Sequence, residues 1–133
     1  MSIDDPLSER ILACAYRVAN ELGPGFLEKV YENALAHELR KCGLVVAQQQ
    51  GIEVRYDGVL IGDFMADLVV EDTIIVELKA VKDLAEIHTA QCLNYLKATR
   101  KSVCLLLNFG KAKLEVRRYE RPNGIFSLDE GDQ

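Results

Sequence analysis

The segment 74–79, Ile-Ile-Val-Glu-Leu-Lys, constrains the fold of this chain most strongly. Side chains of a strand alternate between two faces, so one face is wholly aliphatic, while the other carries Ile75, Glu77 and Lys79. A strand this apolar is expected in the middle of a sheet, where a charge is costly unless it is paired or bound to a metal. The alternative is an edge strand with one face in water. In both cases the segment predicts a sheet that carries a carboxylate and an ammonium side by side.

The remaining segments predict two helices before the strands and one helix between them. Apolar residues recur at helical spacing from Asp5-Pro6 to Gly23-Pro24-Gly25, and again over about 27–42 and 83–99. β-branched runs separated by turn residues, including a hairpin turn at Asp57-Gly58, predict a meander of short strands. These predicted strands cover 44–47, 52–56, 59–61, 64–70, 74–79, 103–109 and 113–119. The order predicts a single α/β (α+β) domain over residues 1–120, with a mixed sheet, followed by a polar tail over 121–133.

Asp67 stands alone among the apolar residues of the predicted strand 64–70, although aspartate is disfavoured in strand interiors. Two registers with the next strand are open. A two-residue turn would pair Asp67 with Val76, so that Asp67 faces away from Glu77. A loop with an odd number of residues, centred on Asp72, would pair Asp67 with Glu77 on one face. Two carboxylates placed opposite each other repel unless a cation lies between them.

The second register predicts a site for a hard divalent cation. Mg²⁺ takes oxygen ligands, keeps several waters and typically uses one or two carboxylates together with substrate phosphate. Lys79 would lie beside the pair, where an ammonium can hold an attacking water or neutralise charge that develops on a phosphoryl group. The competing interpretation is a pair of structural carboxylates held by ion pairs.

Three further residues become relevant if they point at this pair. Gln91 and Tyr95 lie one turn apart on the helix predicted over 83–99, so their amide and hydroxyl can reach a common point. Glu28 lies in the first turn of the helix predicted over 27–42, where the helix dipole favours an acid. Glu32 follows at i+4, which is a mildly unfavourable like-charge pair. A solvated helix surface explains these residues from the sequence alone.

Four short motifs occur in a fixed order along most of the chain: Gly25-Phe26-Leu27-Glu28-Lys29-Val30-Tyr31, Ala66-Asp67-Leu68, Val76-Glu77-Leu78-Lys79-Ala80 and Gln91-Cys92-Leu93-Asn94-Tyr95-Leu96. Spaced in this way, they resemble the GxxExxY protein family, a branch of the PD-(D/E)XK nuclease-like superfamily. The resemblance implies a restriction-endonuclease-like fold, in which a mixed central sheet is flanked by helices. It also implies site roles: Asp67, Glu77 and Glu28 as metal ligands, Lys79 as the catalytic lysine, and Gln91 and Tyr95 as the Q-x-x-x-Y element.

The activity that the resemblance implies is Mg²⁺-dependent or Mn²⁺-dependent hydrolysis of phosphodiester bonds in DNA or RNA by metal-activated water. Two positions depart from the family's pattern. Ala66 replaces the superfamily's proline, and Met65 stands where an arginine is expected in many members, which removes a basic group that would grip substrate. The alternatives are a catalytically silent module that binds nucleic acid or a protein partner, and an enzyme that acts on a small phosphoester. No iron–sulfur cluster is expected, because the four cysteines do not group after Tyr95.

The distribution of charge qualifies what the formal net charge of −5 implies about partners. An acidic chain is not expected to coat nucleic acid through a global positive field. Residues 77–118, however, contain nine basic and four acidic residues. This distribution predicts a local, metal-assisted contact with nucleic acid. The sequence also has no membrane-spanning stretch and no secretory signal, so a cytoplasmic protein is expected, with a homodimer left open.

Overall fold

A five-stranded sheet in the order β1-β2-β3-β4-β5 runs through the computed structural model, which describes residues 5–121. Strands β3 and β4 are parallel, and the other neighbouring strands are antiparallel, so the predicted mixed sheet is confirmed. The predicted polar tail lies outside the described residues, apart from its first residue. The elements are α1 (Pro6–Leu22), α2 (Glu28–Lys41), β1 (Val46–Tyr56), β2 (Val59–Val70), β3 (Ile74–Lys79), α3 (Glu86–Thr99), β4 (Val103–Asn108) and β5 (Glu115–Glu120).

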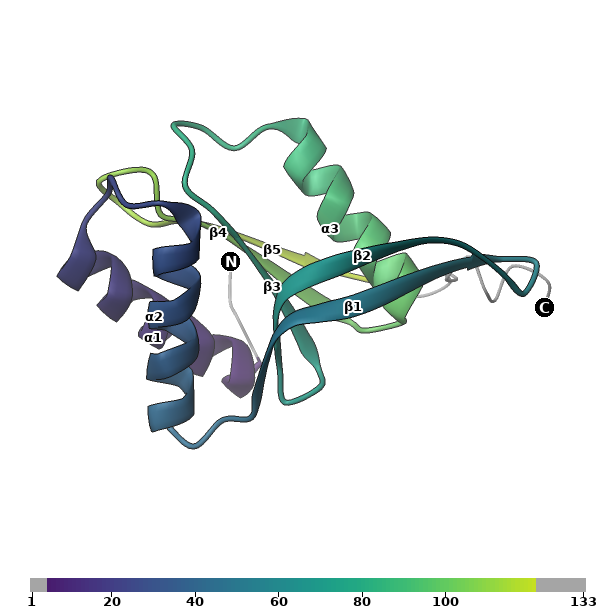
Figure 1. Cartoon of the computed structure of the whole chain (residues 1–133). Helices are drawn as coiled ribbons and strands as arrows, with labels where there is room; N and C mark the ends of the chain where they lie inside the picture. The colour runs from purple at the N-terminus through teal and green to yellow at the C-terminus, as the bar shows by residue number, and fades with distance from the viewer. Residues whose placement is uncertain (1–4, 122–133) are drawn as a thin grey trace.

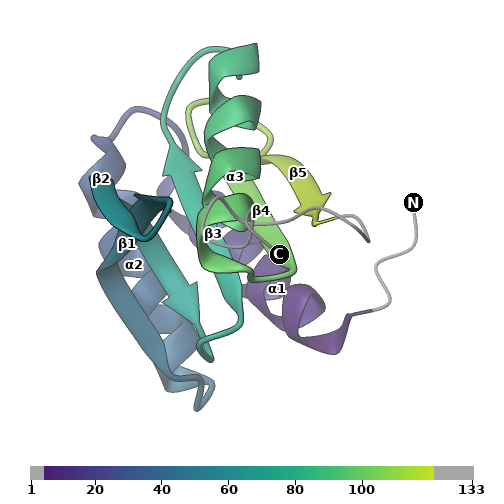
Figure 2. The same ribbon diagram turned by 90° about the vertical axis from the view of Figure 1, so that its right-hand side faces the viewer.

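Helices cover both faces of the sheet (Figures 1 and 2). Figure 2 shows α3 in front of the strands and α1 and α2 behind them. The core on the α1 and α2 side contains residues such as Leu35, Leu39 and Leu105, and the core on the α3 side contains Leu96 and Leu106. Central strands β3 and β4 are therefore buried on both faces, as expected for strands that are almost continuously apolar. No helix within residues 5–121 is both long and apolar enough to cross a membrane.

The first helix begins where the sequence predicts it. The Asp5 side chain accepts a hydrogen bond from the Leu7 N–H at 3.0 Å, and Pro6 occupies the first helical turn, where its missing N–H is not needed. The helix ends at Gly23, whose φ of 68° suits a residue without a Cβ. The second helix ends in the same way, because Gly43 has a φ of 85° just beyond Lys41.

The predicted meander of short strands is wrong in one respect, because four of them join into two long strands. The predicted strands 44–47 and 52–56 form the single strand β1, and 59–61 and 64–70 form β2. Residues with a weak preference for strands, such as Gly62, stay in the sheet because each is paired with a residue of the neighbouring strand, here Val54. The two-residue turn at Asp57-Gly58 is confirmed, with φ values of 54° and 75°. Figure 1 shows the resulting hairpin reaching out past α3.

The register between β2 and β3 follows the second of the two predicted alternatives. Val70 pairs with Ile74 and Leu68 pairs with Val76, so the connecting loop has three residues and is centred on Asp72. Continued by one position, this register places Asp67 opposite Glu77. The hypothesis of a facing carboxylate pair therefore agrees with the fold.

Candidate active site

Asp67 and Glu77 lie where the backbones of β2 and β3 stop pairing. The last backbone pair is Leu68 with Val76. Beyond it, the Asp67 N–H donates a hydrogen bond to Glu77 Oε2 at 2.8 Å, and the Leu78 N–H donates one to Asp67 Oδ2 at 2.9 Å. Each carboxylate thus accepts from the backbone of the opposite strand. These two bonds give each acid a polar partner between apolar strands.

Both acids resist ionisation in this position. Glu77 is 2% exposed, and burial, followed by the charge of Asp67, raises its pKa to about 8. Burial also raises the pKa of Asp67, although hydrogen bonds from Leu78 and Gln49 act in the opposite direction. The charge of Lys79 lowers the pKa of each acid, yet no hydrogen bond or ion pair within residues 5–121 joins its ammonium to either carboxylate. The pair therefore holds a proton more readily than two free carboxylates would, and Lys79 only partly offsets this effect.

The donor set fits a divalent cation completed by water and phosphate. Within the described residues, no group of three His, Cys, Asp or Glu side chains is arranged to hold a metal ion, so a cation at this point could take at most Asp67 and Glu77 as its carboxylate ligands. Hard oxygen ligands in this number are what Mg²⁺ uses when substrate phosphate and water supply the rest of its shell. A cation would also remove the repulsion that raises the pKa of Glu77.

Glu28 is the expected third ligand. It lies near Asp67, but within the described residues its carboxylate does not converge with those of Asp67 and Glu77 on one metal position. It occupies the first turn of α2. Although the residue is exposed, burial of part of its side chain raises its pKa, and the next contribution is the charge of Asp67. The charge of Lys79 acts on it in the opposite sense. The helix therefore brings Glu28 within electrostatic reach of the site.

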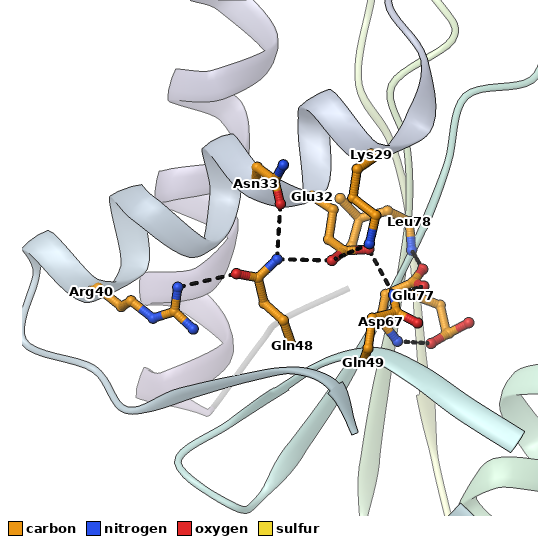
Figure 3. Close-up of polar contacts among 9 residues, drawn as sticks. All are labelled: Lys29, Glu32, Asn33, Arg40, Gln48, Gln49, Asp67, Glu77 and Leu78. Atoms are coloured by element: carbon orange, nitrogen blue, oxygen red, sulfur yellow. Dashed lines mark hydrogen bonds and ion pairs between the residues drawn. The ribbon is translucent and has the colours of Figure 1, made fainter. Parts of the chain in front are cut away.

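Glu32, one turn further along α2, is the buried acid of this helix and was missed by the sequence interpretation. It is 3% exposed. Its carboxylate accepts hydrogen bonds from Lys29 at 3.0 Å, from Gln48 at 2.8 Å and from Gln49 at 2.8 Å (Figure 3). The unfavourable i+4 spacing of Glu28 and Glu32 was the available signal, because an acid kept at such a position needs a partner elsewhere.

Gln49 connects this buried acid to the site. Its Nε2 donates to Glu32 Oε1 at 2.8 Å and to Asp67 Oδ1 at 3.2 Å. Its φ is 53°, an uncommon value for a residue other than glycine. Gln48 and Gln50 pair with Leu68 and Ala66, and no backbone pair is present between them, at the position of Gln49 and Asp67. The irregularity in β1 thus turns the glutamine amide toward Asp67, which is the kind of local strain found at functional sites.

Removing this amide is expected to destabilise the protein. In Gln49→Ala, Glu32 and Asp67 each lose one hydrogen-bond donor, and an unsatisfied polar group that is partly buried costs about 1–3 kcal/mol. Urea denaturation should therefore show a loss of stability in that range. Gln50→Ala is the matched control, because Gln50 is exposed and on the same strand. Equal stability of the two variants would contradict the bridging role of Gln49.

Gln91 and Tyr95 approach the acid pair from α3. Gln91 Nε2 donates to the Tyr95 hydroxyl at 3.0 Å, so the predicted contact between them is confirmed. Tyr95 is 5% exposed, and burial, followed by the charge of Glu77, raises its pKa to about 12. The hydroxyl therefore stays protonated and can donate a hydrogen bond. The structure thus gathers Glu28, Asp67, Glu77, Lys79 and Tyr95 into one electrostatically coupled group.

Three comparisons with known proteins bear on this chain. A model of the PD-(D/E)XK nuclease superfamily matches residues 5–119. Together with the mixed sheet and its flanking helices, this match confirms the restriction-endonuclease-like fold expected from the sequence. The chain is also similar to the solved structure of an alkaline exonuclease from Laribacter hongkongensis. The two share 14% sequence identity and a TM-score of 0.48, over 92% of this chain and 73% of the exonuclease chain. A comparison with curated protein sequences found no match.

Proposed function

Because the chain belongs to the PD-(D/E)XK nuclease superfamily, we propose that it is a nuclease that hydrolyses phosphodiester bonds at Asp67 and Glu77 with Mg²⁺ or Mn²⁺. The observation that carries this proposal is the pair of facing carboxylates between separating strands, Glu77 buried and Asp67 half-buried, with Lys79 two residues beyond Glu77. The sequence D-x₉-E-x-K provides the acid, acid and lysine of the superfamily's name. We place the nuclease domain in residues 1–120 and assign the chain to the GxxExxY branch on its motifs.

Each residue of the site has a role that its position supports. Asp67 and Glu77 would hold the cation, with Glu28 adding negative charge from α2. When bound, the cation supplies Lewis acidity that activates a water and neutralises phosphate charge. Lys79 binds a phosphate oxygen and stabilises charge that develops there. The Tyr95 hydroxyl, oriented by Gln91, donates a hydrogen bond toward the same phosphate or toward its attacking water.

Cleavage assays with a matched pair of aspartate variants test this function. Purified protein is incubated with Mg²⁺ or Mn²⁺ and labelled single-stranded, double-stranded and branched DNA and RNA. We expect cleavage of at least one substrate, complete loss in Asp67→Asn and in chelator, and no loss in Asp63→Asn, because Asp63 is an exposed residue of the same strand. Inertness of wild-type protein across the whole panel would exclude the enzymatic proposal.

One observation supports a second function, a catalytically silent module that binds nucleic acid or a protein partner. Asp67 and Glu77 each accept a backbone N–H across the strand gap, so the pair also has a structural use. Calorimetry with Mn²⁺ separates the two functions. Binding that Asp67→Asn and Glu77→Gln remove favours the enzyme. No heat of binding, even with an oligonucleotide present to complete the shell, favours the silent module.

A further inference from the structure

A groove of about 420 Å³ lies between the β1–β2 hairpin and α3, and Gln91 and Tyr95 of the candidate site are part of its lining. The hairpin contributes Val54 and Phe64, and α3 contributes residues between Ile87 and Lys97. Phe64 is 50% exposed although it is a large apolar residue, and Ile87 is exposed as well. The groove therefore offers an apolar, partly aromatic surface to solvent next to a polar site.

The chemistry of the groove suits one class of ligand. Its lining includes Phe64, and the polar residues Gln91, Asn94 and Lys97 also contribute to it. An aromatic ring stacks on the flat face of a nucleobase. Side-chain amides provide the donors and acceptors that a base edge requires, and a lysine pairs with phosphate. A purely aliphatic ligand would use neither the amides nor the charge.

Tyr95 joins the groove to the candidate active site. Its ring lies 6.0 Å from the Phe64 ring, centroid to centroid, at an interplanar angle of 47°. Its hydroxyl accepts the hydrogen bond from Gln91, and the charge of Glu77 acts on its ionisation. A chain whose phosphate lies at Asp67 and Glu77 would thus present its neighbouring nucleotide to Phe64.

We propose that this groove binds an unpaired nucleobase adjacent to the phosphate held at Asp67 and Glu77, so that the substrate class is single-stranded or frayed nucleic acid. The proposal rests on the nuclease function proposed above and specifies its substrate. Bases inside a duplex are stacked on both sides and paired at their edges, so they cannot lie on Phe64 unless they leave the helix. Duplex ends that fray and single strands meet this requirement.

The absence of tryptophan from the chain allows a direct spectroscopic test. Phe64→Trp introduces a single indole into the groove and keeps an aromatic surface. With Mn²⁺ and cleavage-resistant strands, a single-stranded oligonucleotide should quench its fluorescence at saturation, whereas an abasic strand of equal length and the same backbone should not. Equal responses to the base-containing and abasic strands would overturn the proposal.

Binding of labelled oligonucleotides to the unlabelled protein provides the second measurement. We expect Phe64→Ala to weaken single-strand binding at least tenfold and to leave fully paired duplex binding unchanged. Tyr56→Ala is the matched control, because Tyr56 is an exposed aromatic residue at the far end of the same hairpin. Equal losses in both variants, or a concentration-dependent dimer that Phe64→Ala dissolves without any effect on strand binding, would contradict a base-binding groove.

The outcomes also separate this inference from the nuclease proposal. Cleavage of single strands that requires Asp67 but is unchanged in Phe64→Ala would overturn the groove and leave the nuclease function standing. Base-dependent quenching in a protein that never cleaves would support the groove and contradict the nuclease function.

Discussion

Replacing Glu77 with glutamine is expected to stabilise the metal-free protein at alkaline pH and, at the same time, to abolish hydrolysis. The neutral amide keeps an oxygen that can accept the hydrogen bond from the Asp67 N–H. It removes the charge whose burial, together with the neighbouring Asp67, raises the pKa of Glu77 to about 8. It also removes a proposed metal ligand. Gain of stability and loss of function from one substitution are typical of active sites that hold unfavourable charge.

The direction of the pH effect follows from proton binding. Between pH 4.5 and about 8 the folded protein keeps a proton on Glu77 that the unfolded chain has released. The contribution of Glu77 to the free energy of unfolding of wild-type protein is therefore greatest below pH 4.5. It decreases as pH rises and is lost above about pH 8. At about 1.4 kcal/mol per pKa unit, a shift from 4.5 to about 8 corresponds to at most roughly 4–5 kcal/mol.

Urea denaturation of wild-type protein and Glu77→Gln, measured from pH 5 to pH 9 in chelator, tests this prediction. The two stability curves should diverge with rising pH, with the variant more stable above pH 8. Glu53→Gln is the control, because Glu53 is exposed on β1 and forms a surface ion pair with Arg55. Parallel curves for wild-type protein and Glu77→Gln would show that Glu77 ionises normally and would contradict its buried, acid-paired state.

Lys79→Ala is expected to lower the rate of hydrolysis by a factor of about 10²–10³, the range found when one group that stabilises transition-state charge is removed. Its stability should change by no more than about 1 kcal/mol, because the side chain is only half-buried. A second reason is that the Lys79 ammonium makes no hydrogen bond or ion pair with the part of the chain that the structure describes. Its effect on Asp67 and Glu77 is electrostatic.

Single-turnover cleavage rates at saturating Mn²⁺ measure this effect directly. Lys82→Ala serves as the control, because Lys82 is an exposed lysine three residues further along. Mn²⁺ binding should persist in Lys79→Ala, which separates a role on phosphate from a role on the metal. A rate for Lys79→Ala that equals that of Lys82→Ala would remove Lys79 from the mechanism.

The sequence narrowed the acid pair to one of two registers, because alternation and loop parity restrict β-strand register. Asp67 and Glu77 interrupt apolar strands, and only a loop with an odd number of residues places them on the same face. The contact between Gln91 and Tyr95 was predictable for a similar reason, since i and i+4 residues of a helix lie on one face.

The connection from Asp67 to α2 was not predictable in the same way. It depends on the positive φ of Gln49, and glutamine carries no sequence signal for that conformation. It also depends on Glu32, whose burial is set by the packing of α2 against β1, which helical periodicity alone does not reveal. The long hairpin was missed for a related reason. Its weak strand formers are kept in place by cross-strand partners, which local propensity does not include.

The position of a bound Mn²⁺ ion tests the central claim most directly. Crystals of the protein grown with Mn²⁺ and a short single-stranded oligonucleotide can be measured by anomalous diffraction. We predict an anomalous peak bound by the carboxylates of Asp67 and Glu77, and its loss in Asp67→Asn crystals grown in the same way. Absence of a peak at this pair, or a peak that survives Asp67→Asn unchanged, would contradict the assignment of Asp67 and Glu77 as the metal site of a nuclease.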